Sequence, residues 1–421
     1  MRMMGRGAIA ILPAAKVKLR NRDVDYPYRP DSDFYYLTGF PEPEAVLVLV
    51  PGRTQGEYIL FCREREPERE VWDGPRAGQE GAVRDYGADD SFPIGDIDDI
   101  LPGLLEGRDK VYYTMGRDED FDHHLLAWVN RLRGQSRAGA RSPEEFVSLD
   151  HLLHDMRLFK SRSELSLMRR AAELSARAHT RAMKTCQPGM YEYELEAELL
   201  HVFRGGNAVP AYQSIVGSGP NACVLHHVSN DRQVADGDLV LIDAGAEVGL
   251  YASDVTRTFP ANGRYDPEQR AIYELVLKAQ LAAIDRARPG NHWNEPHATA
   301  VKVITAGLVK LGILDGKPKD LIREEAYRRF FMHRTGHWLG MDVHDVGDYK
   351  VDGRWRQLEP GMVMTVEPGI YIPPGAKGVK SKWHGIGVRI EDDVVVTRDQ
   401  PRVLSKGVPK DPDEIERLMA A

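Results

Sequence analysis

The hydrophobic and polar positions in residues 236–259 predict two strands joined as a hairpin. Aliphatic residues fill positions 239–242, a glycine-containing turn follows, and apolar and polar residues alternate over 251–259. Each predicted strand carries an aspartate, Asp243 or Asp254, among apolar neighbours. A carboxylate in such surroundings takes up a proton or destabilises the fold unless a cation lies beside it. The hairpin therefore predicts a cation-binding site.

A second stretch repeats this pattern. GDLVLIDAG at 237–245 and GMVMTVEPG at 361–369 share a glycine, five strand residues, a carboxylate, one further residue and a glycine. The carboxylates at the shared position are Asp243 and Glu367, and a later predicted strand over 385–397 carries Glu391. We interpret these segments as two related halves that form one metal site.

Predicted helices precede the strands in each half. Ser161 and Glu164 form a capping box, and Asp266, followed by proline and with Gln269 as its box partner, is a second helix start. Further helices are expected over 191–203, ending at a glycine pair suited to a left-handed cap, and over about 295–311. The recurring order of helix, helix and strands predicts a pseudo-twofold α+β domain.

The earlier part of the chain reads as a mixed α/β domain. Strands are expected over 45–50, 58–62 and 110–113, and a helix over 121–133. Residues 8–15 resemble a signal sequence, but they are short and run into basic residues, so we expect an early strand. A Gly/Pro-rich loop over 72–79 holds Trp72. The predicted domains are residues 1–156 and 157–421.

Composition narrows the class of protein. A chain of 421 residues favours two domains, and no apolar run is long enough to span a bilayer. The net charge of −8 comes from interspersed charges, which argues against nucleic acid as a partner. Three scattered cysteines indicate the reducing cytoplasm.

Four carboxylates and one imidazole are the candidate ligands of two divalent cations, which would offset the carboxylate charges and hold a hydroxide between them as nucleophile. The five residues are Asp243, Asp254, His337, Glu367 and Glu391. His333 and His337 stand four apart, but Arg334, Gly336 and Gly340 argue against a zinc-protease helix.

Other polar residues near these ligands have open roles. His226 and His344 are candidates for proton transfer or for steadying an oxyanion. Arg389 lies two residues before Glu391 on the same predicted strand face, and the sequence leaves open whether it orients a ligand carboxylate or binds substrate. No role is assigned to His227.

Several motifs together resemble the bacterial aminopeptidase P (Xaa-Pro aminopeptidase) family of pita-bread metallopeptidases. They extend over nearly the whole chain and include YPYRPDSDFYYLTGF, MRLFKS, IVGSGPNA, LVLIDAG, SDVTRTFP, HWLGMDVHDVG, VEPGIYI and GIGVRIEDDV. The resemblance implies a creatinase-like amino-terminal α/β domain followed by a pita-bread α+β catalytic domain.

The resemblance also implies roles for individual residues. It assigns Asp243, Asp254, His337, Glu367 and Glu391 to two metal ions, usually manganese, with zinc or cobalt as alternatives. It assigns His226 and His344 to the tetrahedral intermediate and Glu367 to activation of the hydroxide. Positions near the substrate pocket match His333, Tyr371 and Arg389. Trp72 is similar to a residue that reaches the site of an adjacent subunit, which implies a homodimer or homotetramer.

The hypothesis is a cytoplasmic enzyme that hydrolyses the bond between an amino-terminal residue and a following proline. A prolidase, which cuts only Xaa-Pro dipeptides, is the nearest alternative, and a non-catalytic binding module with a peptidase fold is a more distant one. This sequence departs from the family in Arg334, which adds a positive charge near the site, and in an amino terminus shorter by one helix.

Overall fold

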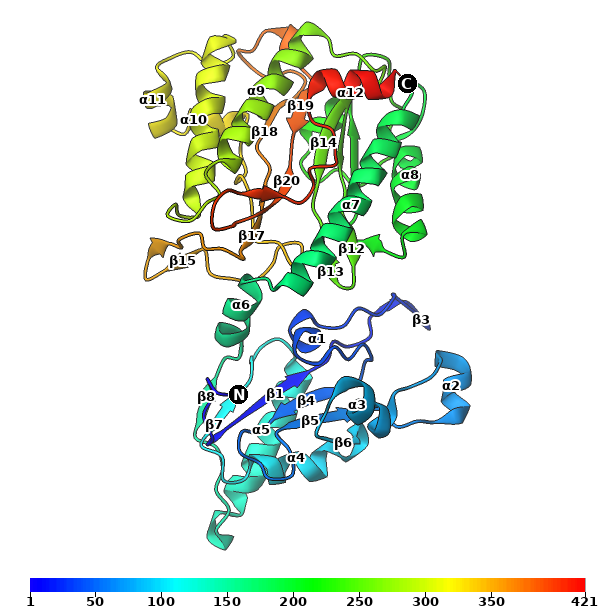
Figure 1. The fold of residues 1–421 in the computed structure, drawn as a ribbon, viewed down its shortest axis with the longest axis vertical. Helices are drawn as coiled ribbons and strands as arrows, with labels where there is room; N and C mark the ends of the chain where they lie inside the picture. Colours follow the sequence, from blue (N-terminus) through cyan, green and yellow to red (C-terminus); the bar gives the residue numbers. More distant parts are fainter. Residues whose placement is uncertain (421) are drawn as a thin grey trace. The chain divides into compact units, whose positions relative to one another are not determined.

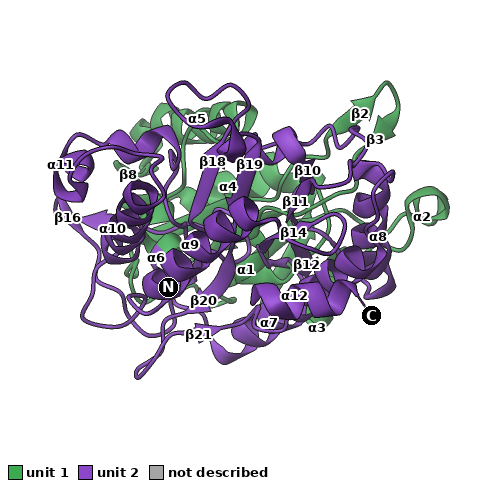
Figure 2. Ribbon diagram, turned by 90° about the horizontal axis from the view of Figure 1, so that it is seen from above, with its two compact units in different colours: residues 1–154 green, residues 155–421 purple. Residues whose placement is uncertain are grey.

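The computed structural model describes residues 1–420, which fold as two compact units divided after His154. Figure 2 colours the two units separately. The predicted two-domain α/β and α+β architecture is confirmed. The boundary predicted between residues 156 and 157 falls inside helix α6 (Asp150–Leu158), and it stays a prediction.

The first unit is built on a six-stranded mixed sheet in the order β6-β5-β4-β1-β7-β8. The early strand predicted over residues 8–15 is confirmed as β1, which pairs antiparallel with β4 and parallel with β7. The strands are β1 (Ala8–Pro13), β4 (Val46–Leu49), β5 (Tyr58–Cys62), β6 (Asp90–Pro93), β7 (Lys110–Tyr112) and β8 (Glu145–Val147).

Alternating side chains of this sheet form two hydrophobic cores. Ile9 and Ile11 pack into one core, whereas Ala8 and Ala10 pack into the other, because successive residues of a strand point to opposite faces. The flanking helices include α1 (Ser32–Thr38), α3 (Gly78–Tyr86), α4 (Ile97–Leu105) and α5 (Glu119–Gly134). The sheet is thus buried on both faces.

The second unit contains two similar halves, as the repeat predicted. Helices α7 (Arg162–Thr185) and α8 (Glu192–Gly205) lie on one side of its strands, and α9 (Pro267–Ile284) and α10 (Asn294–Lys310) lie on the other (Figure 1). Both predicted capping boxes are present, at Ser161 and at Asp266. Helices and strands of both halves share one hydrophobic core.

The strands of each half form a paired ladder followed by a second, separate pair. In the first half β11 (Leu239–Asp243) lies between β10 (Ile215–Ser218) and β14 (Thr256–Pro260), and β12 (Ala246–Val248) pairs with β13 (Tyr251–Ala252). In the second half β17 (Val363–Val366) pairs with β20 (Asp392–Val395), and β18 (Gly369–Ile372) pairs with β19 (Ile386–Arg389).

Some local predictions were wrong. The cap of α8 at Gly206 has a φ of −89°, and the left-handed residue is Asn207, with a φ of 54°. Trp72 lies in a short helix, α2 (Pro67–Asp73), rather than in a loop, and its side chain is 84% exposed. No helix among residues 1–420 is long and apolar enough to cross a membrane.

Candidate metal centre

The two repeated carboxylates stand where a strand gives way to the next strand pair. Asp243 is the last residue of β11, and Glu367 directly follows β17. In each repeat a glycine stands two positions after the carboxylate, and close contacts explain why no larger residue fits there. A Cβ atom on Gly245 would lie 1.7 Å from the Ser253 carbonyl oxygen, and one on Gly369 would lie 2.4 Å from the Tyr371 hydroxyl. Both turns therefore depend on glycine for close packing.

Asp254 and Glu391 lie at the corresponding breaks on the return path. The sequence predicted that each would lie within a continuous strand, but Asp254 falls between β13 and β14, and Glu391 between β19 and β20. At these points the chain leaves one strand pair and enters the other. The Glu391 N–H donates to the Thr256 carbonyl at 3.1 Å, which ties the two halves together beside the carboxylates.

His337 comes from a segment without regular helix, as Gly336 and Gly340 predicted. Its Nδ1 lies 2.9 Å from the Trp338 carbonyl, an acceptor that favours the proton on Nδ1. Its Nε2 lies 3.2 Å from Asp254 Oδ2 and 3.7 Å from Glu367 Oε1. Nε2 of His337 is thus directed at two carboxylates.

These side chains converge on one cavity of about 380 Å³. Its walls include the five predicted ligands and five other polar residues discussed from the sequence, namely His226, His333, Arg334, His344 and Arg389. Tyr371 is fully buried behind the wall, where its hydroxyl lies 2.8 Å from His333 Nε2 and accepts from Arg389 Nη1 at 3.0 Å. Trp72 does not line this cavity.

The electrostatics of the cavity fit a pair of divalent cations. Burial raises the pKa of Asp243 and of Glu391, and it raises the pKa of Glu367 to about 7. Burial acts the same way on Asp254, but the hydrogen bonds from His337 and Tyr212 and the positive charges of His337 and Arg389 together outweigh it and lower the Asp254 pKa. The protein alone therefore disfavours full ionisation of the cluster, and dications would supply the missing positive charge.

The donor set is also appropriate for metal ions. Single ligand atoms of Asp254, His337 and Glu391 lie within 4.8 Å of one another. Carboxylate oxygens with one imidazole suit divalent ions such as manganese, cobalt or zinc. Arg389 Nη2 lies 2.7 Å from Asp243 Oδ2, so in this structure the arginine orients a candidate ligand.

Two residues at the centre were missed from the sequence. The Tyr212 hydroxyl lies 2.6 Å from Asp243 Oδ1 and 2.5 Å from Asp254 Oδ1. The Thr256 hydroxyl donates to Glu391 Oε2 at 2.6 Å. The only signal for Tyr212 is the pairing of Ile215 with Asp243, which brings the segment before β10 to the carboxylates and becomes known only with the strand register.

The segment that carries His337 and His344 is anchored by a buried ionic cluster. Asp345 accepts from Lys160 Nζ at 2.8 Å and from Arg157 Nη2 at 2.5 Å, and all three side chains are at most 3% exposed. Gly340 allows this packing, because a Cβ there would lie 2.1 Å from Asp345 Oδ2. The position of His344 therefore depends on residues outside the cavity.

His226 is anchored in a similar way through its neighbour. His227 Nε2 lies 2.9 Å from Glu192 Oε2, and the buried Glu192 carboxylate also accepts from the Ser218 N–H at 2.6 Å. His227 thus has a structural partner, while His226 lines the cavity.

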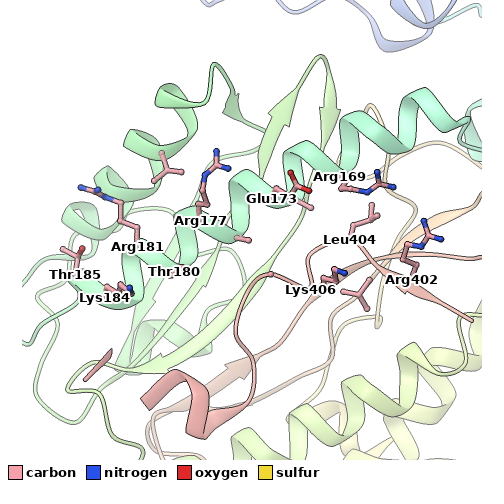
Figure 3. A pocket seen from close by; sticks show the side chains of 15 residues that line it. Arg169, Glu173, Arg177, Thr180, Arg181, Lys184, Thr185, Arg402, Leu404 and Lys406 are labelled. Carbon is pink, nitrogen blue, oxygen red and sulfur yellow. The ribbon is translucent and has the colours of Figure 1, made fainter. Parts of the chain in front are cut away.

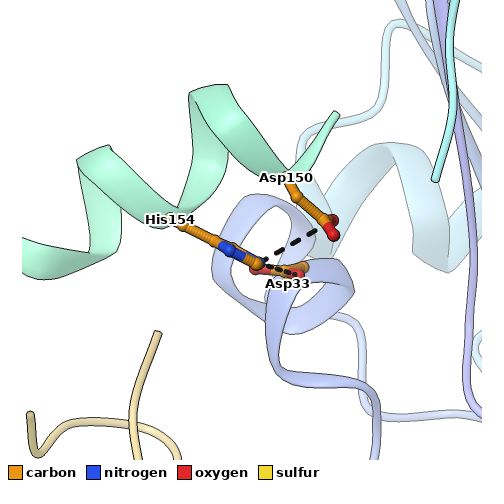
Figure 4. A group of neighbouring side chains, drawn as sticks. All are labelled: Asp33, Asp150 and His154. Atoms are coloured by element: carbon orange, nitrogen blue, oxygen red, sulfur yellow. Dashed lines mark ion pairs between the residues drawn. The ribbon is translucent and has the colours of Figure 1, made fainter. Parts of the chain in front are cut away.

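Two other places in the described chain have features of a binding site. A larger groove of about 1200 Å³ runs along α7 and residues 402–407 (Figure 3), and none of the candidate residues lines it. Asp33, Asp150 and His154 cluster in the first unit (Figure 4). Arg117 lies 3.0 Å from Asp33 and 3.2 Å from Asp150, so this cluster already has a cation.

Comparison with known proteins points in the same direction as the geometry. The model of metallopeptidase family M24 matches residues 166–398, and the model of the aminopeptidase P amino-terminal domain matches residues 1–112. The Xaa-Pro aminopeptidase of Escherichia coli is 47% identical over 99% of this chain and 95% of its own length.

Solved structures agree in fold. The structure of Pseudomonas aeruginosa aminopeptidase PepP is 65% identical, covers 100% of this chain and 95% of its own, and superposes with a TM-score of 0.99. Zinc-substituted aminopeptidase P from E. coli, solved in complex with product, is 46% identical over 99% of this chain and 95% of its own, with a TM-score of 0.96.

Proposed function

This chain belongs to metallopeptidase family M24, and we propose that it removes the first residue from peptides whose second residue is proline. The observation that carries the proposal is the convergence of four carboxylates and one imidazole in one cavity. That cavity lies in a chain similar along its length to proteins named Xaa-Pro aminopeptidase.

As a member of this family the chain uses divalent metal ions. We propose that Asp243, Asp254, His337, Glu367 and Glu391 hold two of them, with manganese preferred and zinc or cobalt as substitutes. The chemistry that such ions supply when bound is Lewis acidity, which activates water and polarises a carbonyl. The Asp254 and Glu391 carboxylates, one from each half, would bring ligands of both halves to the same ions, because their oxygens lie within 4.8 Å of each other and of His337.

The remaining cavity residues supply proton transfer and positioning. Glu367, which lines the cavity with its Oε1 3.7 Å from His337 Nε2, takes the proton of the attacking water. His226 and His344 face the cavity and stabilise the developing charge on the carbonyl oxygen. His333 forms part of the pocket for the proline ring, and the buried Tyr371 positions it through the hydrogen bond between them.

Proline explains why a dedicated enzyme is needed. Its nitrogen carries no hydrogen and its ring fixes φ, so a peptidase that recognises a peptide N–H after the scissile bond has nothing to hold. As in hydrolysis of any peptide bond, the departing prolyl nitrogen must gain a proton from the site. We assign this proton to the same carboxyl, Glu367, that received it from water.

The test is hydrolysis of matched peptides by protein that has been stripped of metal and reloaded with manganese, cobalt or zinc. Release of the first residue from Xaa-Pro-Xaa and not from Xaa-Ala-Xaa is expected. Cleavage of the Xaa-Pro dipeptide alone would favour a prolidase instead. Absence of cleavage with every metal would contradict the proposal and favour a binding module.

A homo-oligomer is part of the proposal. Val71 and Trp72 are adjacent on α2, are 82% and 84% exposed, and that helix buries no residue. Large exposed apolar side chains of this kind favour a partner surface. We propose a dimer or tetramer in which Trp72 reaches the site of a neighbouring subunit. We also propose a cytoplasmic location, which three free cysteines favour. Light scattering of the wild type and of Trp72→Ala tests the assembly, with a monomeric wild type contradicting it.

A further inference from the structure

Arg334 is a cavity residue that the metal centre does not use. It lies between His333 and the metal-ligand candidate His337, and it lines the same cavity as the carboxylates. Its side chain is exposed to solvent rather than packed in the core. A substrate in the cavity would therefore meet its guanidinium directly.

Two neutral groups hold the Arg334 side chain. Its Nη2 donates to Asn294 Oδ1 at 2.9 Å, and its guanidinium carbon lies 5.1 Å from the centre of the Trp355 ring. A cation over an indole face gains a moderate attraction and keeps its charge. The side chain is thus oriented without being neutralised.

No carboxylate pairs with Arg334 in the part of the chain that the structure describes. The other arginine of the cavity, Arg389, lies against Asp243. Two divalent cations would offset the four carboxylates of the centre, so the positive charges of both arginines would remain, and only that of Arg389 has a carboxylate beside it. Burial lowers the pKa of the nearby His297 to about 4, and the charges of Arg334 and Arg328 act in the same direction.

We propose that Arg334 selects substrates that present a carboxylate beyond the proline, either as the chain terminus of a short peptide or as an acidic side chain at the third residue. This inference rests on the proposed function. The Arg334 charge repels the positive amino end of a peptide and attracts a carboxylate. A guanidinium also binds a carboxylate through two parallel hydrogen bonds.

The experiment compares peptides that differ only in charge. Xaa-Pro-Leu is assayed as free acid and as amide, and Xaa-Pro-Asp-amide is assayed against Xaa-Pro-Asn-amide. The wild type is expected to favour each carboxylate by about 3- to 10-fold in kcat/KM, as for a partly solvated charged hydrogen bond. The first pair reports on the chain terminus and the second on the acidic side chain, so the two sources are separated.

Variants assign any preference to Arg334. R334Q is expected to bring the preferences to about 1-fold, and R334K to keep part of them, because it keeps the charge but not the planar fork. Lys350→Gln is the matched control. Lys350 lies 4.5 Å from the same Trp355 ring but does not line the cavity, so K350Q should keep the wild-type ratios.

Three results would overturn the inference: equal rates for both charge pairs in the wild type, ratios in R334Q equal to those of the wild type, or a loss of preference in K350Q as large as in R334Q. Cleavage of the amide peptides by the wild type would show that the proposed function holds even where the inference about Arg334 fails. Calorimetric binding of the dipeptides Pro-Leu and Pro-leucinamide gives the same comparison without turnover. The wild type should favour the acid, and this difference should shrink at high salt.

Discussion

Replacement of Gly245 by alanine tests how closely the backbone must pack beside the metal centre. The new Cβ would lie 1.7 Å from the Ser253 carbonyl oxygen and 2.6 Å from its carbon. The oxygen must retreat by at least about 1.3 Å to reach the edge of allowed contact distances. Ser253 directly precedes Asp254, whose N–H is held by Asp393 at 3.0 Å, so the shift is transmitted to a proposed metal ligand.

Such a shift should remove most activity while the protein stays folded. A misplacement of about 1 Å at a reacting centre costs about 100-fold in rate, whereas an overpacked methyl costs about 1–3 kcal/mol of stability. We therefore expect kcat/KM on an Xaa-Pro peptide to fall at least about 100-fold in G245A, with weaker binding of metal. Stopped-flow assays and metal analysis of the dialysed protein measure the two effects.

Gly205→Ala is the matched control for this experiment. Gly205 ends α8, and nothing lies within 4 Å of the atom that alanine would add there. This variant should keep wild-type turnover and gain up to about 1 kcal/mol of helix stability. Wild-type metal content together with activity within about 3-fold in G245A would refute the packing argument.

Two further predictions concern buried titratable groups outside the cavity lining. Lys160→Met leaves Asp345 buried with Arg157 alone, so the free energy of unfolding in urea should fall by about 3 kcal/mol. Asp345→Asn in the same chain should restore part of this stability. No loss of stability in K160M would contradict the role of the cluster. Burial lowers the pKa of His179, which bonds the Ala244 carbonyl, from 6.5 to about 4. The unfolded state then binds the extra proton, so stability that is complete above pH 6.5 should decline by about 3 kcal/mol towards pH 4. His179→Gln in metal-free protein should flatten this decline, and an unchanged pH profile would contradict the assignment.

The repeated parts of the site could be predicted from the sequence because the information there is local. The spacing of strand, carboxylate and glycine identifies Asp243 and Glu367 without knowledge of the fold. Capping boxes at Ser161 and Asp266 fix helix starts for the same reason, since each pairs residues three apart.

Other parts of the site depend on distant contacts. Asp243, one partner of Tyr212, is 31 residues away from it, and Asp345 is 185 residues from Lys160, so no local pattern predicts either pair. The strand breaks at Asp254 and Glu391 were also hidden, because alternation of apolar residues continues through positions where the backbone changes sheets. Tertiary packing decides these features.

The most direct test of the central claim is the number of divalent cations bound to each chain. Isothermal titration of metal-stripped protein with manganese should give two sites, and anomalous diffraction should place both ions among Asp254, His337 and Glu391 and their neighbours. Asp254→Asn should lose at least one ion together with turnover. A wild type that binds no cation in this cavity, or a D254N variant that keeps two ions and full activity, would contradict the account.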